Sequence, residues 1–145
     1  MQRAVKIVLL LTVILGLQAC GKKPAPAPTP VTPQEPQGEL IIEDIKEGTG
    51  VAVQNSMRIA VHYVGTLEGG PQFDSSRERG KPFIFTIGIG SVIQGWEQGI
   101  LGMKPGGVRK LTSPPHLAYG DKRVGRIIPP NATLVFEIEL LEIFQ

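Results

Sequence analysis

The sequence predicts an α+β domain, an antiparallel sheet of five to six strands wrapped around one short helix. From residue 39 onward strand-like segments greatly outnumber helical ones, because apolar residues alternate or form short continuous runs. Helical spacing occurs only in 92–101. Strands and helices do not alternate regularly along the chain, as they would in a protein with a parallel sheet. Residues 39–145 are numerous enough for one hydrophobic core and too few for two.

Each expected element has a local signature. The clearest strand is 56–67, where the odd-numbered residues from Met57 to Tyr63 lie on one face and the even-numbered residues from Arg58 to Val64 on the other. The helix is expected to be short, because Gly95 and Gly99 interrupt it. Glycine and proline turn signals separate the elements. Strands are expected, in order, at 40–48, 56–67, 82–87, 108–112 and 133–144, with a long loop at 114–130.

The first 38 residues differ in character from the rest of the chain. A short basic start precedes about eleven apolar residues, and Ala19 and Cys20 follow, which is the layout of a secretory signal. The apolar run is too short to span a bilayer as a helix. The order Leu-Gln-Ala-Cys resembles a bacterial lipobox. Residues 1–19 are therefore expected to be a signal peptide cleaved before Cys20, and an uncleaved anchor helix is the alternative.

The lipobox resemblance implies that Cys20 is the site of lipid attachment and that the lipid bilayer is a partner of the chain. Several acyl chains give a stable anchor, whereas a single chain gives only a marginal one. Gly21 follows the cysteine, where a signal for retention in the inner membrane usually has Asp. The expected location is therefore the bacterial cell envelope, at the outer membrane, on its periplasmic or surface face.

Residues 20–38 are expected to form a proline-rich tether. Gly21 to Gly38 contains six prolines in eighteen residues, a composition that favours an extended, solvated chain over helix or central strand. A docking ligand for another domain is the alternative. Once Arg3 and Lys6 are removed with the signal, 13 basic and 13 acidic residues remain. This balance, without a basic stripe, argues against nucleic acid as a partner.

The common catalytic constellations are missing from residues 39–145. The single cysteine lies before them, so they contain no thiol nucleophile. His62 and His116 have no carboxylate or cysteine at metal-ligand spacing. No Gly-x-Ser-x-Gly sequence and no phosphate-binding glycine loop occurs. The sequence therefore implies no metal and no organic cofactor.

All eight aromatic residues lie between Tyr63 and Phe144. A core of this size could absorb them, so their clustering alone does not indicate a binding pocket. The motifs around them, however, resemble the FKBP family of prolyl isomerases, in order and spacing, over essentially all of residues 39–145. These motifs are VHYVG at 61–65, FDSSRER at 73–79, KPF at 81–83, VIQGWE at 92–97, LAYG at 117–120 and IIPPNATLVF at 127–136.

The resemblance implies a site that receives a proline ring, with Trp96 as its floor. The residues it assigns to catalysis are Tyr63, Asp74, Trp96, Tyr119 and Phe136, and those it assigns to substrate binding are Phe73, Phe83, Val92, Ile93, Ile127 and Ile128. The Asp74 carboxylate is expected to be held by Tyr63 or Arg79 in a hydrogen-bond network. Phe85 and Phe144 are assigned to packing. Taken singly, each site residue also has a plain packing or surface alternative.

The activity implied by the resemblance is cis-trans isomerisation of peptide bonds before proline, which would assist protein folding at the envelope. Isomerisation is a rotation about the peptide bond and breaks no covalent bond. It therefore needs no nucleophile, which agrees with the absence of nucleophilic motifs. The expected mechanism combines desolvation of the bond with a hydrogen bond from the Ile93 N–H or the Tyr119 hydroxyl to the substrate carbonyl, without a covalent intermediate. A non-catalytic module or chaperone that binds proline segments on the same fold is the alternative.

The resemblance also bears on partners. Proline-containing polypeptides are the expected clients, and a macrolide of the FK506 or rapamycin type is an expected ligand. A monomer is expected, because no dimerising helical arm precedes the domain. The loop at 121–126, with three basic residues, departs from the family pattern and leaves the contacts of that loop open.

Overall fold

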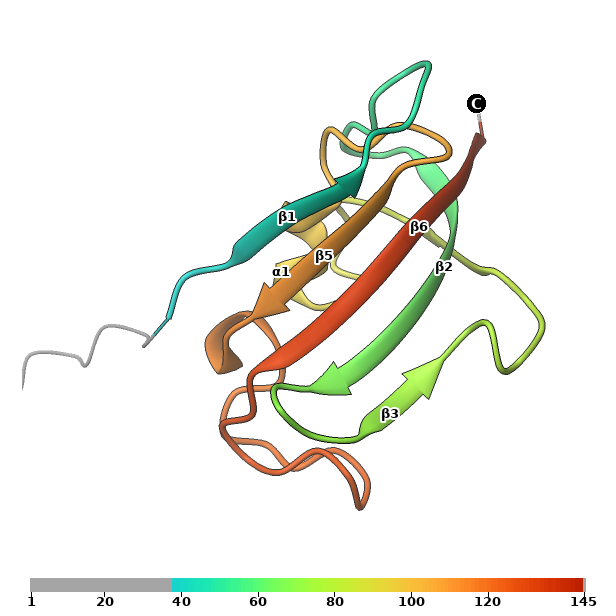
Figure 1. Cartoon of the computed structure of the whole chain (residues 1–145). Coiled ribbons are helices and arrows are strands. Elements are labelled where there is room, and N and C mark those ends of the chain that lie inside the picture. The colour runs from blue at the N-terminus through green and yellow to red at the C-terminus, as the bar shows by residue number, and fades with distance from the viewer. Residues whose placement is uncertain (1–37, 145) are drawn as a thin grey trace, which may run out of the picture. The chain divides into compact units, whose positions relative to one another are not determined.

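The computed structural model describes residues 38–144, in which six strands form one antiparallel sheet (Figure 1). The order is β1-β5-β6-β2-β3, and β4 pairs separately with β2. The strands are β1 (Ile41–Lys46), β2 (Arg58–Leu67), β3 (Gln72–Ser75), β4 (Phe83–Thr86), β5 (Val108–Ser113) and β6 (Leu134–Phe144). One α-helix, α1 (Gln94–Gly99), and one 3₁₀ turn, η1 (Pro115–Leu117), complete this part of the chain.

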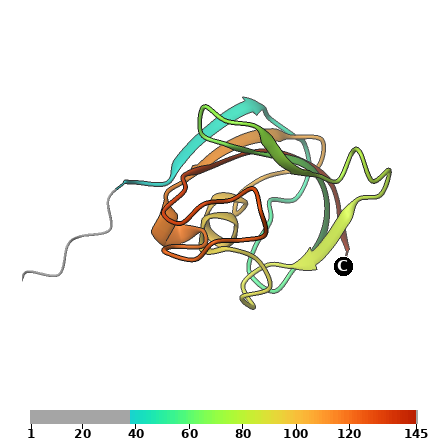
Figure 2. The same cartoon turned by 90° about the horizontal axis from the view of Figure 1, so that it is seen from below.

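The long pairing of β2 with β6 forms the centre of the sheet. Its register runs from Arg58 opposite Phe144 to Leu67 opposite Leu134. Alternate residues of both strands are fully buried, as the period of two requires when one face covers a core. Seen from below, the sheet curves around α1 (Figure 2). The helix and the inward side chains of β2 and β6 therefore share one hydrophobic core.

The glycines that shorten α1 also allow it to lie close to β5. A Cβ atom at Gly95 would lie 2.3 Å from Ser113 Oγ, and one at Gly99 would lie 2.6 Å from Leu111 Cδ1. Both distances are too short for any side chain. The helix therefore approaches the sheet only because these positions carry no side chain, and this approach places Trp96 in the core.

The predicted α+β class, with an antiparallel sheet around one short helix, is confirmed. The helix is shorter than the predicted segment 92–101 and covers only Gln94–Gly99. Strand β3, over Gln72–Ser75, was not predicted. Its four residues show no clear alternation, and their extended conformation comes from pairing with β2 rather than from a local pattern.

The N-terminal predictions lie outside the described residues. This applies to the signal peptide at 1–19, to Cys20 and to the tether at 20–38, apart from Gly38. Between residues 38 and 144, no helix combines the length and the apolar character that crossing a membrane would take.

Candidate active site

A pocket of about 170 Å³ opens where side chains from β2, β3, β4, β6 and α1 meet. Two loops complete it, the segment just before α1 and the segment just after η1. The lining residues are Tyr63, Phe73, Asp74, Phe83, Ser91, Val92, Ile93, Trp96, Tyr119 and Phe136. Nine of these ten were predicted as site residues, and the structure brings them together from distant parts of the sequence. Ser91 is the lining residue that was not predicted.

Trp96 lies at the centre of the aromatic part of the pocket. Its side chain is almost completely buried, with 4% exposed. Three rings meet it in edge-to-face geometry, and the centroid distances are 5.0 Å to Tyr63, 6.1 Å to Phe83 and 5.3 Å to Phe136. Edge-to-face pairs restrict the relative orientation of the rings. The indole is therefore held in one orientation, as a floor must be.

The second layer of aromatic rings supports the first. Phe73 meets Phe136 edge-on, with 5.7 Å between ring centroids. Phe85 is buried in the core and stacks on Phe83, with 5.2 Å between centroids. Packing was the predicted role of Phe85, and the structure agrees.

Asp74 is held by two side chains in a hydrogen-bond network. The Tyr63 hydroxyl donates to Asp74 Oδ2, and Arg79 Nη1 donates to Asp74 Oδ1. Arg79 Nη2 also donates to the Tyr63 hydroxyl at 2.8 Å. The predicted network is confirmed, and both named partners take part in it. It joins β2 to β3 and to the turn after β3.

Hydrogen bonding and burial shift the pKa values of Tyr63, Asp74 and Tyr119. Burial raises the pKa of Tyr63, and its hydrogen bond to Asp74 adds to that rise. Burial alone would raise the pKa of Asp74, but the hydrogen bonds from Tyr63 and Arg79, together with the Arg79 charge, outweigh it and lower the pKa. Burial, with a contribution from the Asp74 charge, raises the pKa of Tyr119. At neutral pH the pocket therefore contains one carboxylate and two neutral phenol groups.

Glu97 positions the loop that precedes α1. Its carboxylate is buried, and it accepts hydrogen bonds from the Gly88 N–H and, at 2.9 Å, from the Gly90 N–H. This loop carries Ser91, Val92 and Ile93 into the pocket. Sequence reasoning missed Glu97. The available signal was the turn with Gly88 and Gly90, because backbone N–H groups of a turn that pair with no strand need another acceptor.

The backbone N–H of Ile93 remains available to a ligand. Ile93 is the residue before the helix and has an extended conformation, with φ −62° and ψ 153°. Its carbonyl accepts from the N–H groups of Trp96 and Glu97. Its own N–H donates to no other group within residues 38–144. A free donor at the mouth of an apolar pocket is a group that a bound carbonyl would satisfy.

Two predicted binding residues do not line the pocket. Ile128 is 5% exposed and belongs to the hydrophobic core. Ile127 is 49% exposed on the neighbouring loop. Phe144, which was assigned to packing, lies at the end of β6. The Arg58 guanidinium lies over its ring, with 5.6 Å between Arg58 Cζ and the ring centroid.

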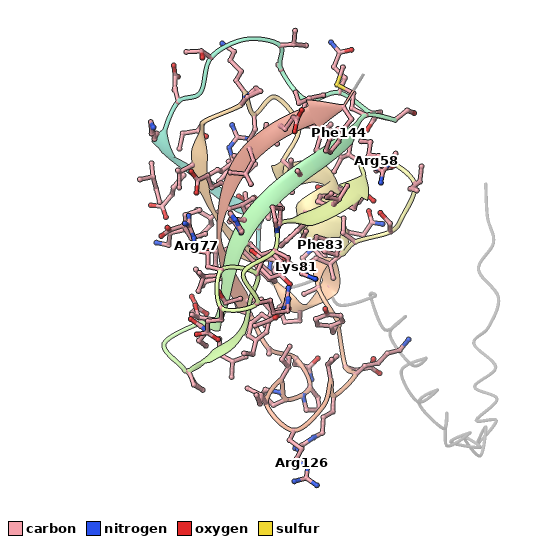
Figure 3. The ribbon with its side chains drawn as sticks, turned by 90° about the vertical axis from the view of Figure 1, so that its right-hand side faces the viewer. Arg58, Arg77, Lys81, Phe83, Arg126 and Phe144 are labelled. Carbon is pink, nitrogen blue, oxygen red and sulfur yellow. The ribbon has the colours of Figure 1, made fainter. Side chains whose placement is uncertain are left out.

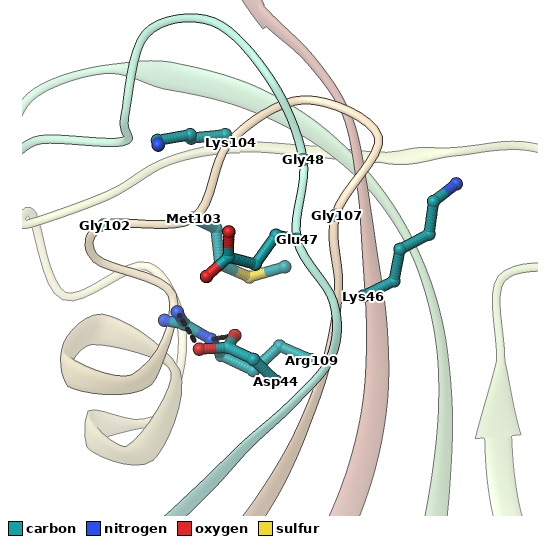
Figure 4. A pocket seen from close by; sticks show the side chains of 9 residues that line it. All are labelled: Asp44, Lys46, Glu47, Gly48, Gly102, Met103, Lys104, Gly107 and Arg109. Carbon is teal, nitrogen blue, oxygen red and sulfur yellow. Dashed lines mark hydrogen bonds and ion pairs between the residues drawn. The ribbon is translucent and has the colours of Figure 1, made fainter.

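A second hollow, of about 90 Å³, has a structural explanation (Figure 4). Arg109 Nε and Nη2 donate to the two carboxylate oxygens of Asp44 at 2.5 and 3.1 Å. Arg109 Nη1 donates to the carbonyls of Gly99 at 2.7 Å and Leu101 at 3.0 Å. The guanidinium thus ties β1 and β5 to the end of α1, and four of its five N–H donors are occupied.

Residues 50–141 match the family model of the FKBP-type peptidyl-prolyl cis-trans isomerases. The fold and the pocket agree with this class of protein. The chain therefore belongs to the FKBP family, and its enzyme class is that of the peptidyl-prolyl cis-trans isomerases. Proteins of this family bind proline-containing substrates and FK506-type ligands.

Relatives in distant organisms resemble the same part of the chain. It is 51% identical to the FK506-binding protein of Neisseria meningitidis serogroup A over 108 residues, which are 74% of this chain and 99% of that protein. It is 52% identical to FK506-binding protein 1 of Dictyostelium discoideum over 97 residues, 67% of this chain and 91% of that protein. Among solved structures, the crystal structure of AtFKBP13 matches with a TM-score of 0.67 and 45% identity, covering 71% of this chain and 91% of that chain.

Proposed function

We propose that this chain accelerates X–Pro isomerisation in polypeptides that fold at the bacterial cell envelope. The observation that carries the proposal is the pocket itself, an aromatic cavity with Trp96 as its floor and a single compensated charge, Asp74, at its side. Its volume of about 170 Å³ suits a ring the size of proline and the bond next to it. The packed rings hold this shape before a substrate arrives.

Desolvation supplies one part of the proposed rate enhancement. Amide resonance imposes a barrier of about 18–20 kcal/mol on rotation about the peptide bond. The planar amide is more polar than the twisted form, and water stabilises it. Transfer into an apolar pocket removes that water and lowers the free energy of the twisted form relative to the planar one. Only interactions that favour the twisted form accelerate the reaction.

Hydrogen bonds supply the other part. The free Ile93 N–H and the Tyr119 hydroxyl are the two donors proposed to hold substrate carbonyls. Asp74 acts through its field and by fixing Tyr63, not by proton transfer, because its lowered pKa keeps it ionised at neutral pH. The proposed mechanism therefore has no covalent intermediate and needs no nucleophile.

A protease-coupled assay with an Ala-Leu-Pro-Phe peptide tests this function on the full chain. Trp96→Ala and Asp74→Val should each lower kcat/KM, whereas Phe144→Ala, which alters an aromatic residue outside the pocket, should leave it unchanged. Circular dichroism establishes that each variant is folded. Unchanged turnover in a folded Trp96→Ala, Asp74→Val double variant would sink the assignment. Tight peptide binding by a wild-type chain that does not accelerate isomerisation would show a binding module instead.

We also propose that the chain is anchored through acylated Cys20, at the outer membrane, and acts as a monomer. The support is the order of a basic start, an apolar run and Leu-Gln-Ala-Cys in the sequence. Mass spectrometry of the mature N-terminal peptide should show acyl groups on Cys20, and Cys20→Ala should release the protein into the soluble fraction. Recovery of the chain with residues 1–19 still attached would contradict this proposal. Light scattering of the detergent-solubilised protein measures its molar mass, which should be that of a monomer.

A further inference from the structure

The loop beside the pocket is positively charged, although the domain around it is not. We call residues 120–131 the rim loop. It contains Lys122, Arg123 and Arg126 against a single acidic residue, Asp121, and so has a formal charge of +2. The chain totals of 15 basic and 13 acidic residues include four basic and one acidic residue before Gly38. The remaining 11 basic and 12 acidic residues give the domain a net charge of −1.

The cations of the rim loop are not engaged in ion pairs within residues 38–144. The four ion pairs found there join Arg77, Arg79, Arg109 and Lys110 to carboxylates on β1, β3 and β6. Lys122, Arg123 and Arg126 are all exposed. Their charges therefore stabilise the described domain through no ion pair, and they are accessible to a binding partner.

The backbone of the rim loop is nevertheless well fixed. The Asn131 N–H donates to the Gly120 carbonyl at 2.7 Å and closes the base of the loop. Near the tip, Val124 and Ile128 exchange two backbone hydrogen bonds of 3.1 and 3.2 Å. The buried Ile128 side chain anchors the tip in the core. Cations on a fixed backbone lose less entropy on binding than cations on a mobile one.

The rim loop begins at the wall of the pocket. Tyr119 lines the pocket, and the loop leaves from the next residue. Figure 3 shows Arg126 at the far end of this loop and Lys81, another exposed cation, beside Phe83 of the pocket. Four residues of chain span at most about 14 Å, which limits the distance from Tyr119 to Arg123. An extended peptide advances about 3.3 Å per residue, so about four client residues cover the same distance.

We propose that the rim loop is a second contact site for the client and selects proline segments that carry Asp or Glu within about four residues of the proline. This inference rests on the proposed isomerase function. Asp74 is the one lining residue of the pocket with a charged side chain, and Arg79 compensates its charge. A client segment that leaves the pocket on the Tyr119 side therefore meets the uncompensated cations of the rim loop. Acidic side chains would form exposed ion pairs with them.

The test compares three peptides with the same Ala-Leu-Pro-Phe centre, flanked on either side by three Glu, three Gln or three Lys residues. Isomerisation by the full chain is measured at low ionic strength and in about 0.5 M salt. Exposed ion pairs are individually weak, so the Glu peptide should exceed the Gln peptide by about 3- to 10-fold in kcat/KM, mainly through KM. Salt should remove the difference, since it screens exposed charges.

Two matched variants locate the effect. Arg123→Gln with Arg126→Gln should abolish the preference for Glu and leave turnover of the Gln peptide unchanged. Lys46→Gln with Lys104→Gln removes the same charge from exposed positions outside the pocket lining and should preserve the preference. Rescue by Arg123→Lys with Arg126→Lys would show that charge, and not loop shape, is responsible.

The outcomes separate this inference from the function on which it rests. Equal turnover of the Glu and Gln peptides by an active enzyme overturns the inference and leaves the isomerase function standing. Failure to accelerate any of the three peptides overturns both. A further arm measures binding to vesicles of anionic phospholipid. If the rim-loop variant loses vesicle binding while the wild type shows no preference among peptides, the loop contacts lipid and the inference is wrong.

Discussion

Glu97 offers a sharp test of how the pocket is held in shape. Its buried carboxylate accepts hydrogen bonds from two backbone N–H groups, those of Gly88 and Gly90. The substitution Glu97→Gln keeps the shape of the side chain but replaces one acceptor oxygen by an NH₂ group that can only donate. One of the two backbone donors is then left facing another donor in a partly buried site.

The expected cost follows from the two hydrogen bonds. A bond to a charged acceptor contributes about 1.5–3 kcal/mol, and a neutral one about 0.5–1.5 kcal/mol. Glu97→Gln loses one charge-assisted bond and converts the other into a neutral one, so the free energy of unfolding should fall by roughly 2–4 kcal/mol. The loop between Gly88 and Ile93 should loosen, and KM should rise more than kcat falls, because Val92 and Ile93 lose their fixed positions in the pocket.

Urea denaturation and the proline-isomer assay check both effects on the full chain. Trp96 is the single tryptophan, so its fluorescence reports unfolding and the environment of the pocket floor together. Glu68→Gln is the control, since Glu68 is exposed and its side chain makes no hydrogen bond within residues 38–144. If Glu97→Gln matches Glu68→Gln in unfolding free energy and in KM, the reasoning about this carboxylate is refuted.

Three other substitutions test the pocket and its supports. Trp96→Ala should lower the unfolding free energy by roughly 3–5 kcal/mol in urea, because it removes a buried aromatic side chain; a loss below about 1 kcal/mol would show that the indole is not part of the core. Asp74→Asn should change the acid limb of stability. The lowered folded pKa of Asp74 gives a stabilisation that is present above its unfolded pKa of about 3.9 and lost as the pH falls through the folded value, so melting points of wild type and variant should converge in acid and diverge towards neutral pH. Gly95→Ala places a Cβ 2.3 Å from Ser113 Oγ, and the resulting displacement of α1 from β5 should cost about 1–3 kcal/mol, measurable as a lower urea midpoint; an unchanged midpoint would contradict the close approach.

The sequence predicted best those elements whose pattern is local. Strand β2 buries every second residue from Val61 to Gly65, so its inward face could be assigned from the sequence, and Tyr63 is buried as expected. Strand β3 has no such pattern, because its four residues are extended only through pairing with β2. The two glycines of α1 indicated a short helix from propensity, but the more important reason is their contact with Leu111 and Ser113, which no local pattern contains.

The same distinction explains the site. Trp96 and Phe136 were assigned to the pocket through the family resemblance, and both line it in the structure. Ile127 and Ile128 are adjacent in a loop, where the direction of a side chain depends on the backbone pairing of Ile128 with Val124. That pairing turns Ile128 into the core and leaves Ile127 exposed, so neither reaches the pocket. Lys122, Arg123 and Arg126 of the same loop are exposed, and the family motif predicts no contacts for them because the loop departs from it.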